Sequence, residues 1–338
     1  MRDLKSMTFD EIAGVVTACG EKPFRARQLF EWMGKGVDDF DEITNLPAAM
    51  LDKMKQSYYV SYVKIEKKLV SRLDGTVKYL FRLRDGEYIE SVVMHYKHGY
   101  SICISTQAGC NMGCTFCAST RGGKHRDLTA GEMLSQIYTA QKDLCIRVSN
   151  VVLMGMGEPL DNYKQTVRFL QLVGCEQGLH IGMRHISLST CGLVDQIQKL
   201  QTLRLQITLS ISLHAPNDTI RRQLMPVAKK WSIQQLIDAC KAYIDETGRR
   251  ISFEYAVVKD VNDSDACAVE LAGLLKGMLC HINLIPVNQI ENGNCMRPDM
   301  NRIHRFEALL QQHGLNTTIR RTLGADIAAS CGQLRGNR

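Results

Sequence analysis

The sequence predicts an α/β protein: a partial (β/α)6 barrel preceded by a small helical domain and a β-hairpin extension. Three observations lead to this fold class. Residues 8–60 have helical periodicity, residues 63–97 alternate apolar and polar side chains, and from residue 101 onwards apolar segments alternate with amphipathic ones. Because parallel strands need crossover helices, the last pattern predicts a parallel sheet covered by helices.

Three short helices are predicted in the first part of the chain. Thr8 and Glu11 have the spacing of a capping box, and Pro23 is suited to the first turn of a second helix. We therefore expect residues 1–62 to form an accessory helical domain. Its basic side chains could contact phosphate groups.

A β-extension is predicted next, at residues 63–97. Its alternation of apolar and polar residues is interrupted at Asp74-Gly75 and at Asp85-Gly86. Asp-Gly pairs favour the tight turns of β-hairpins. We therefore expect antiparallel strands on either side of each pair.

Six apolar, β-branched segments are the candidate barrel strands, at residues 101–106, 150–155, 185–190, 205–214, 251–258 and 281–287. Amphipathic stretches that predict helices lie between them. Six strand–helix units, where a closed barrel has eight, predict an incomplete barrel with an open side. We expect the barrel to span residues 98–290, and residues 291–338 to form a C-terminal helix and a tail.

The composition is that of a globular protein. The chain has 338 residues, 45% of them hydrophobic, and no stretch with the roughly 18 apolar residues that a membrane helix needs. Thirteen cysteines without a secretory signal predict free thiols in a reducing cytoplasm. The net charge of +7 fits a polyanionic partner such as RNA, and a solvated surface explains it almost as well. A monomer is the default expectation.

Cys110, Cys114 and Cys117 lie in one turn-rich stretch, CNMGCTFC, on the loop after the first strand. Parallel α/β barrels build active sites on such loops. A zinc site would need Cys103 as its fourth ligand, but Cys103 lies inside the strand, and the glycines of the stretch argue against three core thiols. Thiolates bind zinc or iron–sulfur clusters, and a cubane cluster normally takes four. Three thiolates therefore predict a [4Fe–4S] cluster with one iron left for a substrate.

The segment LMGMGEPLDN closes the second predicted strand. It lacks the third glycine and the Lys-Ser/Thr of a phosphate-binding loop, and Glu158 would repel an anion. Close backbone approach at Gly157 beside a carboxylate suits the ammonium group of an amino acid instead. Polar residues also occur where three later predicted strands end. Ordinary strand-end capping would explain any one of them, but all three strand ends face the same barrel mouth. The candidate ligand contacts at these ends are Ser189, Ser212, Leu213, His214 and Asn288.

The cysteine spacing, with Phe116 before the last cysteine, resembles the radical S-adenosylmethionine (radical SAM) superfamily. That resemblance implies a partial (β/α)6 barrel, a [4Fe–4S] cluster on the three cysteines, and S-adenosylmethionine bound through its amino group by Gly157 and Glu158. Further segments resemble the RlmN/Cfr family of radical SAM RNA methyltransferases over essentially the whole chain: GMGEPLDN, STCGL, SLHAPND, LMPV, LIPVN and DIAASCGQLR.

This family resemblance implies methylation of an adenine ring carbon, with two molecules of S-adenosylmethionine consumed per turnover. Cys331 is implied to accept a methyl group by displacement. A 5′-deoxyadenosyl radical then removes hydrogen from the S-methyl group, and the carbon radical adds to the base. Cys103 is implied to resolve the protein–RNA adduct through a disulfide with Cys331. Glu90 aligns with an acidic residue of the family, and either Glu90 or Cys103 takes the ring proton.

Two regiochemistries exist in the family. The RlmN type methylates carbon 2 of adenine 2503 in 23S rRNA and, in some bacteria, carbon 2 of adenine 37 in tRNA. The Cfr type methylates carbon 8 of the same rRNA adenine. Pro159, in GEPL, favours the RlmN type, because the Cfr type resembles GEAL there.

The resemblance also implies partners. The substrates would be 23S rRNA and tRNA, and a flavodoxin-type electron donor is usual for the superfamily. Four basic residues beside the cysteine loop are expected to contact RNA phosphates: Arg121, Lys124, His125 and Arg126. Two other functions stay open, a radical SAM protein maturase and a non-catalytic iron–sulfur RNA-binding protein.

Overall fold

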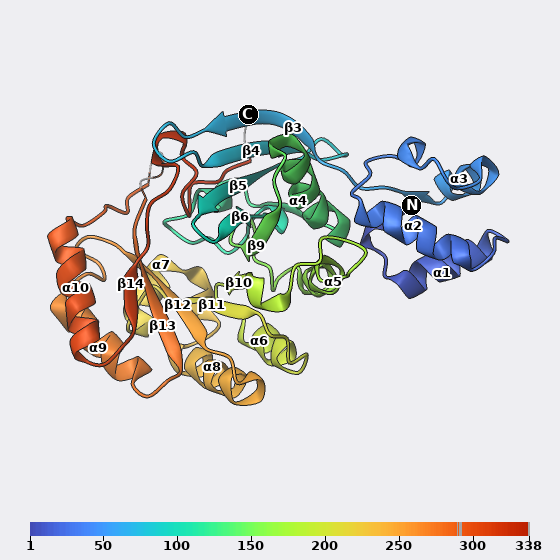
Figure 1. The fold of residues 1–338 in the computed structure, drawn as a ribbon. Coiled ribbons are helices and arrows are strands. Elements are labelled where there is room, and N and C mark those ends of the chain that lie inside the picture. The colour runs from blue at the N-terminus through green and yellow to red at the C-terminus, as the bar shows by residue number, and fades with distance from the viewer. Residues whose placement is uncertain (289, 291–292, 337–338) are drawn as a thin grey trace.

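The N-terminal residues fold into a small helical domain. The structure, a computed structural model, describes residues 1–288, 290 and 293–336. The domain consists of α1 (Phe9–Ala18), α2 (Phe24–Gly34) and α3 (Ala48–Lys55), and the short parallel strands β1 (Arg2–Asp3) and β2 (Tyr58–Tyr59). The expected capping box is formed, with the Thr8 N–H donating to Glu11 at 2.8 Å. The domain lies to one side of the barrel (Figure 1).

One ten-stranded sheet runs through the rest of the described chain, in the order β14-β13-β12-β11-β10-β9-β6-β5-β4-β3. The extension supplies β3 (Lys64–Val70), β4 (Val77–Arg82) and β5 (Tyr88–Tyr96), which pair antiparallel around the two expected turns. Strand β5 also pairs antiparallel with the first barrel strand, β6. The extension is therefore continuous with the barrel sheet, a pairing that residue alternation alone does not reveal.

The six expected barrel strands are confirmed, and all pair in parallel: β6 (Gly99–Cys103), β9 (Val148–Leu153), β10 (Ile186–Thr190), β11 (Thr208–Ser212), β12 (Ile251–Val257) and β13 (Cys280–Pro286). A seventh parallel strand, β14 (Thr317–Ile319), pairs with β13. Its three residues, TTI, are too few and too polar to be recognised as a strand in the sequence. Residue 291, where the expected C-terminal segment begins, lies outside the described residues.

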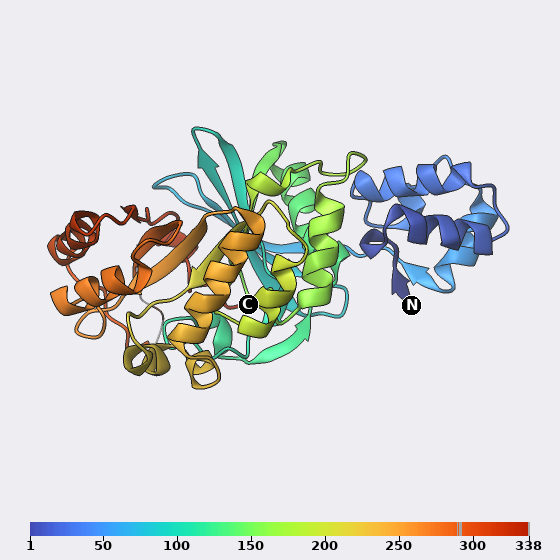
Figure 2. The ribbon, with the colours of Figure 1, turned by 90° about the horizontal axis from the view of Figure 1, so that it is seen from below.

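Helices cover one face of the curved sheet, in a row that Figure 2 shows from below. They are α4 (Ala130–Leu144), α5 (Tyr163–Val173), α6 (Val194–Gln201), α8 (Ile233–Thr247), α9 (Asp265–Leu275) and α10 (Met300–Gln312). Their amphipathic pattern explains this position, because each of these helices turns an apolar stripe towards the sheet. Helix α7 (Asp218–Leu224) lies against the cysteine loop instead. In α5, for example, Phe169, Leu170 and Val173 are buried. Within the described chain, none of the helices combines the length and apolar character of a membrane span.

The tail after β14 is held between the extension and the cysteine loop. The Ser71 hydroxyl and the Arg72 N–H both donate to Asp326, at 2.7 and 2.9 Å. The Ala118 N–H, next to the third cysteine of the loop, donates to the Gly332 carbonyl at 2.7 Å. These contacts come from distant parts of the sequence, and they place Cys331 at the carboxyl end of the barrel.

Candidate functional site

A cavity that is open to solvent lies at the carboxyl ends of the barrel strands. The cavity brings together most of the predicted site residues: Cys110, Cys114, Cys117, Gly157, Glu158, Ser189, Ser212, His214, Asn288 and Cys331. The predicted candidates that do not line it are Leu213, Cys103 and Glu90.

The cysteine loop, residues 110–117, is fixed at both ends by backbone contacts. It lies between the short antiparallel strands β7 (Gln107–Gly109) and β8 (Lys124–Asp127). Gly109 has φ +76°, and a Cβ there would lie 1.8 Å from the Gly123 carbonyl oxygen. The Thr115 N–H donates to the Leu224 carbonyl on α7 at 3.0 Å. The loop is therefore held against both its own strands and helix α7.

The three cysteines fit an iron–sulfur cluster better than a single metal ion. Among the described residues, no three His, Cys, Asp or Glu side chains converge closely enough to hold one ion. Cluster cysteines bind separate irons, so they need not converge as zinc ligands do. Burial raises the pKa of Cys110 to about 12 and that of Cys114 well above its usual value. Burial of this kind disfavours an uncompensated thiolate, and a metal bound to the sulfur would supply the compensating charge.

Glu158 is a buried carboxylate with a fixed orientation. Its two oxygens accept hydrogen bonds from the Leu160 N–H at 3.0 Å and from the Cys191 N–H at 2.7 Å. Burial raises the pKa of Glu158. The hydrogen bonds to its carboxylate lower the pKa in part, and the bond from the Cys191 N–H has the largest such effect. A carboxylate held in this way in the cavity wall can bind a cation such as an ammonium group.

Gly157 is required by the packing of this segment. Its φ is +99°, and a Cβ there would lie 2.5 Å from the Gln107 Cβ and 2.8 Å from the Gln107 nitrogen. We therefore expect Gly157→Ala to lower the free energy of unfolding by about 2–4 kcal/mol, through backbone strain and overpacking. Urea unfolding of the apoprotein measures this loss.

Gly14→Ala is the matched control for that prediction. Gly14 lies inside α1, and a Cβ there would meet nothing within 4 Å. Because glycine is a poor helix former, this substitution should raise stability by roughly 0.5–1 kcal/mol. Equal stability of the Gly157→Ala variant and the wild-type protein would show that the segment can relax.

His214 supplies a hydrogen-bond donor to the cavity wall. Its Nδ1 accepts the Ala256 N–H at 2.8 Å, so the neutral ring carries its proton on Nε2. Burial lowers the pKa of His214 to about 3, and its ring packs edge-on against Phe116, with 4.7 Å between the centroids. Leu213, by contrast, is fully buried in the hydrophobic core.

Cys331 lies where the main cavity meets a second, smaller one. Met154, Asn288, Arg320 and Cys331 line both cavities, and Cys103 lines the smaller one. The Asn288 amide donates to the Cys331 carbonyl at 3.1 Å. Burial raises the pKa of Cys103 to about 12, and the nearby Cys331 contributes to this rise to a smaller extent. All thirteen cysteines are free thiols, so the expected disulfide between Cys103 and Cys331 is not formed in this structure.

Glu90 lies on β5 beneath the tail and is buried. One carboxylate oxygen pairs with the Lys78 ammonium at 2.9 Å, and the other accepts the Arg335 N–H at 2.7 Å. Lys78 also donates to the Ala328 carbonyl at 3.0 Å. The carboxylate therefore anchors the tail in this structure.

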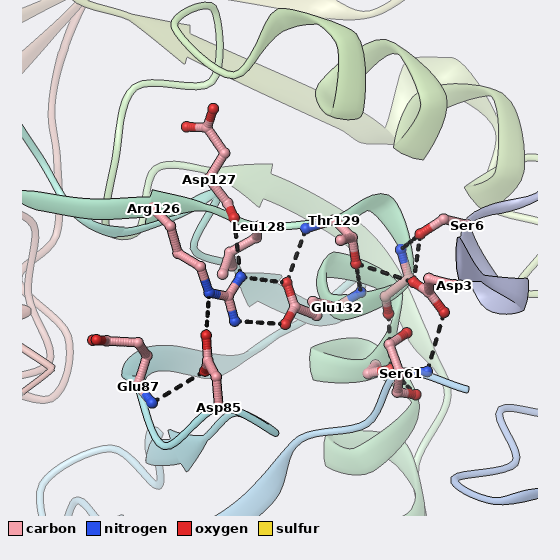
Figure 3. Close-up of polar contacts among 12 residues, drawn as sticks. Asp3, Ser6, Ser61, Asp85, Glu87, Arg126, Asp127, Leu128, Thr129 and Glu132 are labelled. Carbon is pink, nitrogen blue, oxygen red and sulfur yellow. Dashed lines mark hydrogen bonds and ion pairs between the residues drawn. The ribbon is translucent and has the colours of Figure 1, made fainter. Parts of the chain in front are cut away.

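The basic residues beside the cysteine loop are largely engaged within the protein. Figure 3 shows Arg126 between Glu132 and Asp85, and it makes two hydrogen bonds of 2.8 Å to Glu132. His125 bonds to Glu87 at 2.6 Å. Lys124 pairs with Asp127 and Asp161 at 3.3 and 2.8 Å. Arg121 is exposed and is the best placed of the four to contact a phosphate.

The same region joins the helical domain to the barrel. Asp3 accepts hydrogen bonds from the Ser6 and Thr129 hydroxyls, at 2.6 and 3.0 Å (Figure 3). It also accepts the Ser61 N–H at 3.1 Å. A single buried carboxylate thus connects both ends of the helical domain to the start of α4.

Two charged residues of the cavity wall were not predicted from the sequence. Glu254 on β12 accepts from Asn283 and Ser252 at 3.0 and 3.1 Å and lies 3.6 Å from Arg320. The neighbouring Cys331 sulfur raises the pKa of Arg320, and Glu254 raises it further by a smaller amount. A carboxylate in the middle of the apolar strand ISFEYAVV is a signal that could have revealed Glu254. The sequence around Arg320 contains no comparable feature that would have singled out this residue.

Comparisons with known proteins agree with this geometry. Residues 104–271 match the family described as the radical SAM superfamily, and residues 2–60 match the ribosomal RNA large subunit methyltransferase N-terminal domain. A probable dual-specificity RNA methyltransferase RlmN from Alkaliphilus oremlandii is 56% identical over 98% of this chain and 97% of its own length. A protein of the same description from Clostridium novyi is 52% identical over 100% of this chain and 98% of its own.

A solved structure is also similar over its full length. The crystal structure of a radical SAM methyltransferase from Sphaerobacter thermophilus superimposes with a TM-score of 0.94 and is 41% identical. The match covers 100% of both chains. The helical domain, the extension, the barrel and the tail therefore all have counterparts in a solved structure.

Proposed function

The chain belongs to the RlmN family of radical SAM dual-specificity RNA methyltransferases, and from that premise we propose that it methylates carbon 2 of adenine 2503 in 23S rRNA and carbon 2 of adenine 37 in tRNA. The family uses a [4Fe–4S] cluster and S-adenosylmethionine. One observation carries the proposal to this chain: the tail brings Cys331 into the same cavity as Cys110, Cys114 and Cys117.

The chemistry of the target atom explains why a cysteine is needed. Carbon 2 of adenine lies between two ring nitrogens and is not nucleophilic, so it cannot attack a sulfonium methyl group directly. We propose that the Cys331 thiolate accepts the methyl group first, with S-adenosylhomocysteine as the leaving group. Arg320 lines the same two cavities as Cys331, which brings a positive charge to the place where the methyl group would be accepted.

The remaining steps follow from a carbon radical on the methylated Cys331. Cys110, Cys114 and Cys117 would hold the [4Fe–4S] cluster, whose chemistry would supply the electron for cleavage of a second S-adenosylmethionine. The methyl group on Cys331 would lose a hydrogen atom to the 5′-deoxyadenosyl radical, and its carbon would then add to carbon 2. The adduct would return one electron to the cluster and lose the ring proton. Cys103, as a thiolate, would then bond to the Cys331 sulfur as the bond from that sulfur to the methylene carbon breaks, and this carbon would take a proton to become the methyl group. The smaller cavity that Cys103 and Cys331 share supports this pairing.

Two groups are candidates for removing the ring proton, Cys103 and Glu90. Cys103 shares a cavity with Cys331. The Glu90 carboxylate is bound to Lys78 and to the tail backbone. Both groups stay candidates for the base, and the contacts of Glu90 support a role in positioning the tail.

The contacts with S-adenosylmethionine are proposed for the residues that line the cavity. Glu158 would bind the ammonium group beside Gly157. Ser189, Ser212, His214 and Asn288, together with the backbone at Leu213, would form the rest of the site. His214 donates through Nε2 in this arrangement, as its hydrogen bond to Ala256 requires.

Residues 1–62 are proposed to contact the RNA. Phe24 is 54% exposed, and the Arg25 guanidinium lies 4.8 Å from its ring centroid. Exposed aromatic and arginine side chains bind unpaired bases by stacking. The proposal includes a cytoplasmic monomer reduced by a flavodoxin-type donor, as the family resemblance implies.

Mass spectrometry of RNA from cells with and without the gene tests the proposed function. We expect 2-methyladenosine to disappear from 23S rRNA and from tRNA in the deletion strain, and to return on complementation. Loss of 8-methyladenosine instead would assign the Cfr type. Unchanged RNA nucleosides would overturn the proposal and favour a protein substrate.

A further inference from the structure

Arg221, on α7, is a fully buried cation whose charge has no carboxylate partner within ion-pair distance in the described part of the chain. Its Nε donates to the Leu213 carbonyl at 3.2 Å, and its Nη2 donates to the Cys191 and Ser212 carbonyls at 2.7 and 3.3 Å. Its Nη1 has no hydrogen-bond partner among the described residues. Buried charges are costly unless paired, so this arginine calls for an anion that the polypeptide does not supply.

The helix that carries Arg221 packs directly against the cysteine loop. The Thr115 N–H donates to the Leu224 carbonyl at 3.0 Å, and a Cβ at Gly113 would lie 3.1 Å from the Pro226 ring. Cys114 packs in the same apolar group as Cys191 and Leu224. Arg221 therefore lies behind the loop that would hold the cluster.

The other buried charge nearby does not pair with Arg221. Glu158 accepts the N–H of Cys191 at 2.7 Å, while Arg221 donates to the carbonyl of Cys191 at 2.7 Å. Cys191 thus lies between the two charged groups. Burial lowers the pKa of Arg221. The sulfurs of Cys191 and Cys114 make the largest contributions in the opposite direction.

We propose that Arg221 is the counter-charge of the [4Fe–4S] cluster and raises its reduction potential. A cluster bound by three thiolates is anionic, and reduction adds one more negative charge. A fixed buried cation stabilises the reduced form more than the oxidised form. Arg221 would thereby make the electron transfer that precedes radical formation easier. This role goes beyond the methyl-transfer steps and rests on the proposed cluster ligation.

A purely structural role is the alternative. In that case Arg221 would only link three carbonyl groups of neighbouring segments, and its charge would not matter. The two roles differ in one measurable quantity, because a structural contact affects stability but has no systematic effect on the potential of the cluster.

The test compares Arg221→Gln, which removes the charge, with Arg221→Lys, which keeps it. Arg222→Gln is the matched control, because Arg222 is exposed on the same helix. Each protein is reconstituted anaerobically, its iron and sulfide are measured, and the midpoint potential is determined by a redox titration followed by EPR. We expect a more negative potential for Arg221→Gln, a smaller shift for Arg221→Lys, and no shift for Arg222→Gln.

An unchanged potential in iron-replete Arg221→Gln would overturn the role of Arg221 without affecting the cluster ligation. If the wild-type protein bound no iron on anaerobic reconstitution, the proposed ligation of the cluster by the three cysteines would be refuted. If Arg221→Gln does not retain a cluster, thermal unfolding of both variants as apoproteins decides the question. The neutral variant should then be at least as stable as Arg221→Lys, because no anion compensates the buried charge. A less stable neutral apoprotein would support the structural role.

Discussion

Replacing Cys331 with alanine should abolish RNA methylation, by roughly a thousand-fold or more, while the cluster content stays at the wild-type level. The reason is that the nucleophile of the first methyl transfer is lost and no other group can hold the methyl group for the radical step. The protein with RNA and S-adenosylmethionine would be assayed for 2-methyladenosine by mass spectrometry. A peptide map of wild-type protein should show the methyl group on Cys331.

Cys19→Ala is a suitable control, because Cys19 ends α1 in the helical domain. This variant should methylate RNA at the wild-type rate. Methylation by the Cys331→Ala protein would remove the S-methylcysteine intermediate from the proposal and favour a radical SAM enzyme with another substrate. Since Cys331 is only partly buried, its replacement should not disturb folding.

Replacing Cys114 with alanine should remove the cluster and with it all formation of 5′-deoxyadenosine. Three cysteines already leave one iron without a protein ligand, and loss of another thiolate leaves two open positions. Iron and acid-labile sulfide in anaerobically reconstituted protein should fall to background, and the visible absorption of the cluster should disappear.

Cys191→Ala is the matched control for that experiment. Cys191 is buried in the same apolar group as Cys114 and also lines the cavity, but it lies outside the three-cysteine loop. This variant should keep its iron. Full iron content in Cys114→Ala, or tightly bound zinc in wild-type protein, would contradict the cluster assignment.

The chemistry-bearing loop and the strands could be predicted because their signals are local. Cys110, Cys114 and Cys117 are close in sequence, and their spacing alone restricts the chemistry. The barrel strands are short apolar runs with helical segments between them, and burial on both faces leaves that pattern in any parallel sheet. The capping box at Thr8 is equally local, since its two partners are three residues apart.

Contacts between distant segments could not be predicted in the same way. Strand β14 has three residues and exists because β13 offers it an edge. Arg320 follows that strand and lies beside Cys331 and Glu254 only because the sheet continues to this point. Glu90 was expected near the chemistry, but its pairing with Lys78 and the tail depends on how the extension and the tail pack.

The sequence by itself determined the order of strands and helices, the three thiols on one loop, and the family to which the chain is related. Each of these depends on residues near one another in the chain or on the order of segments. The tertiary structure alone decided that the tail crosses to the cysteine loop and that Arg221 is buried behind it without a carboxylate. Such pairings arise from packing over hundreds of residues, and no local pattern of side chains encodes which distant groups come into contact.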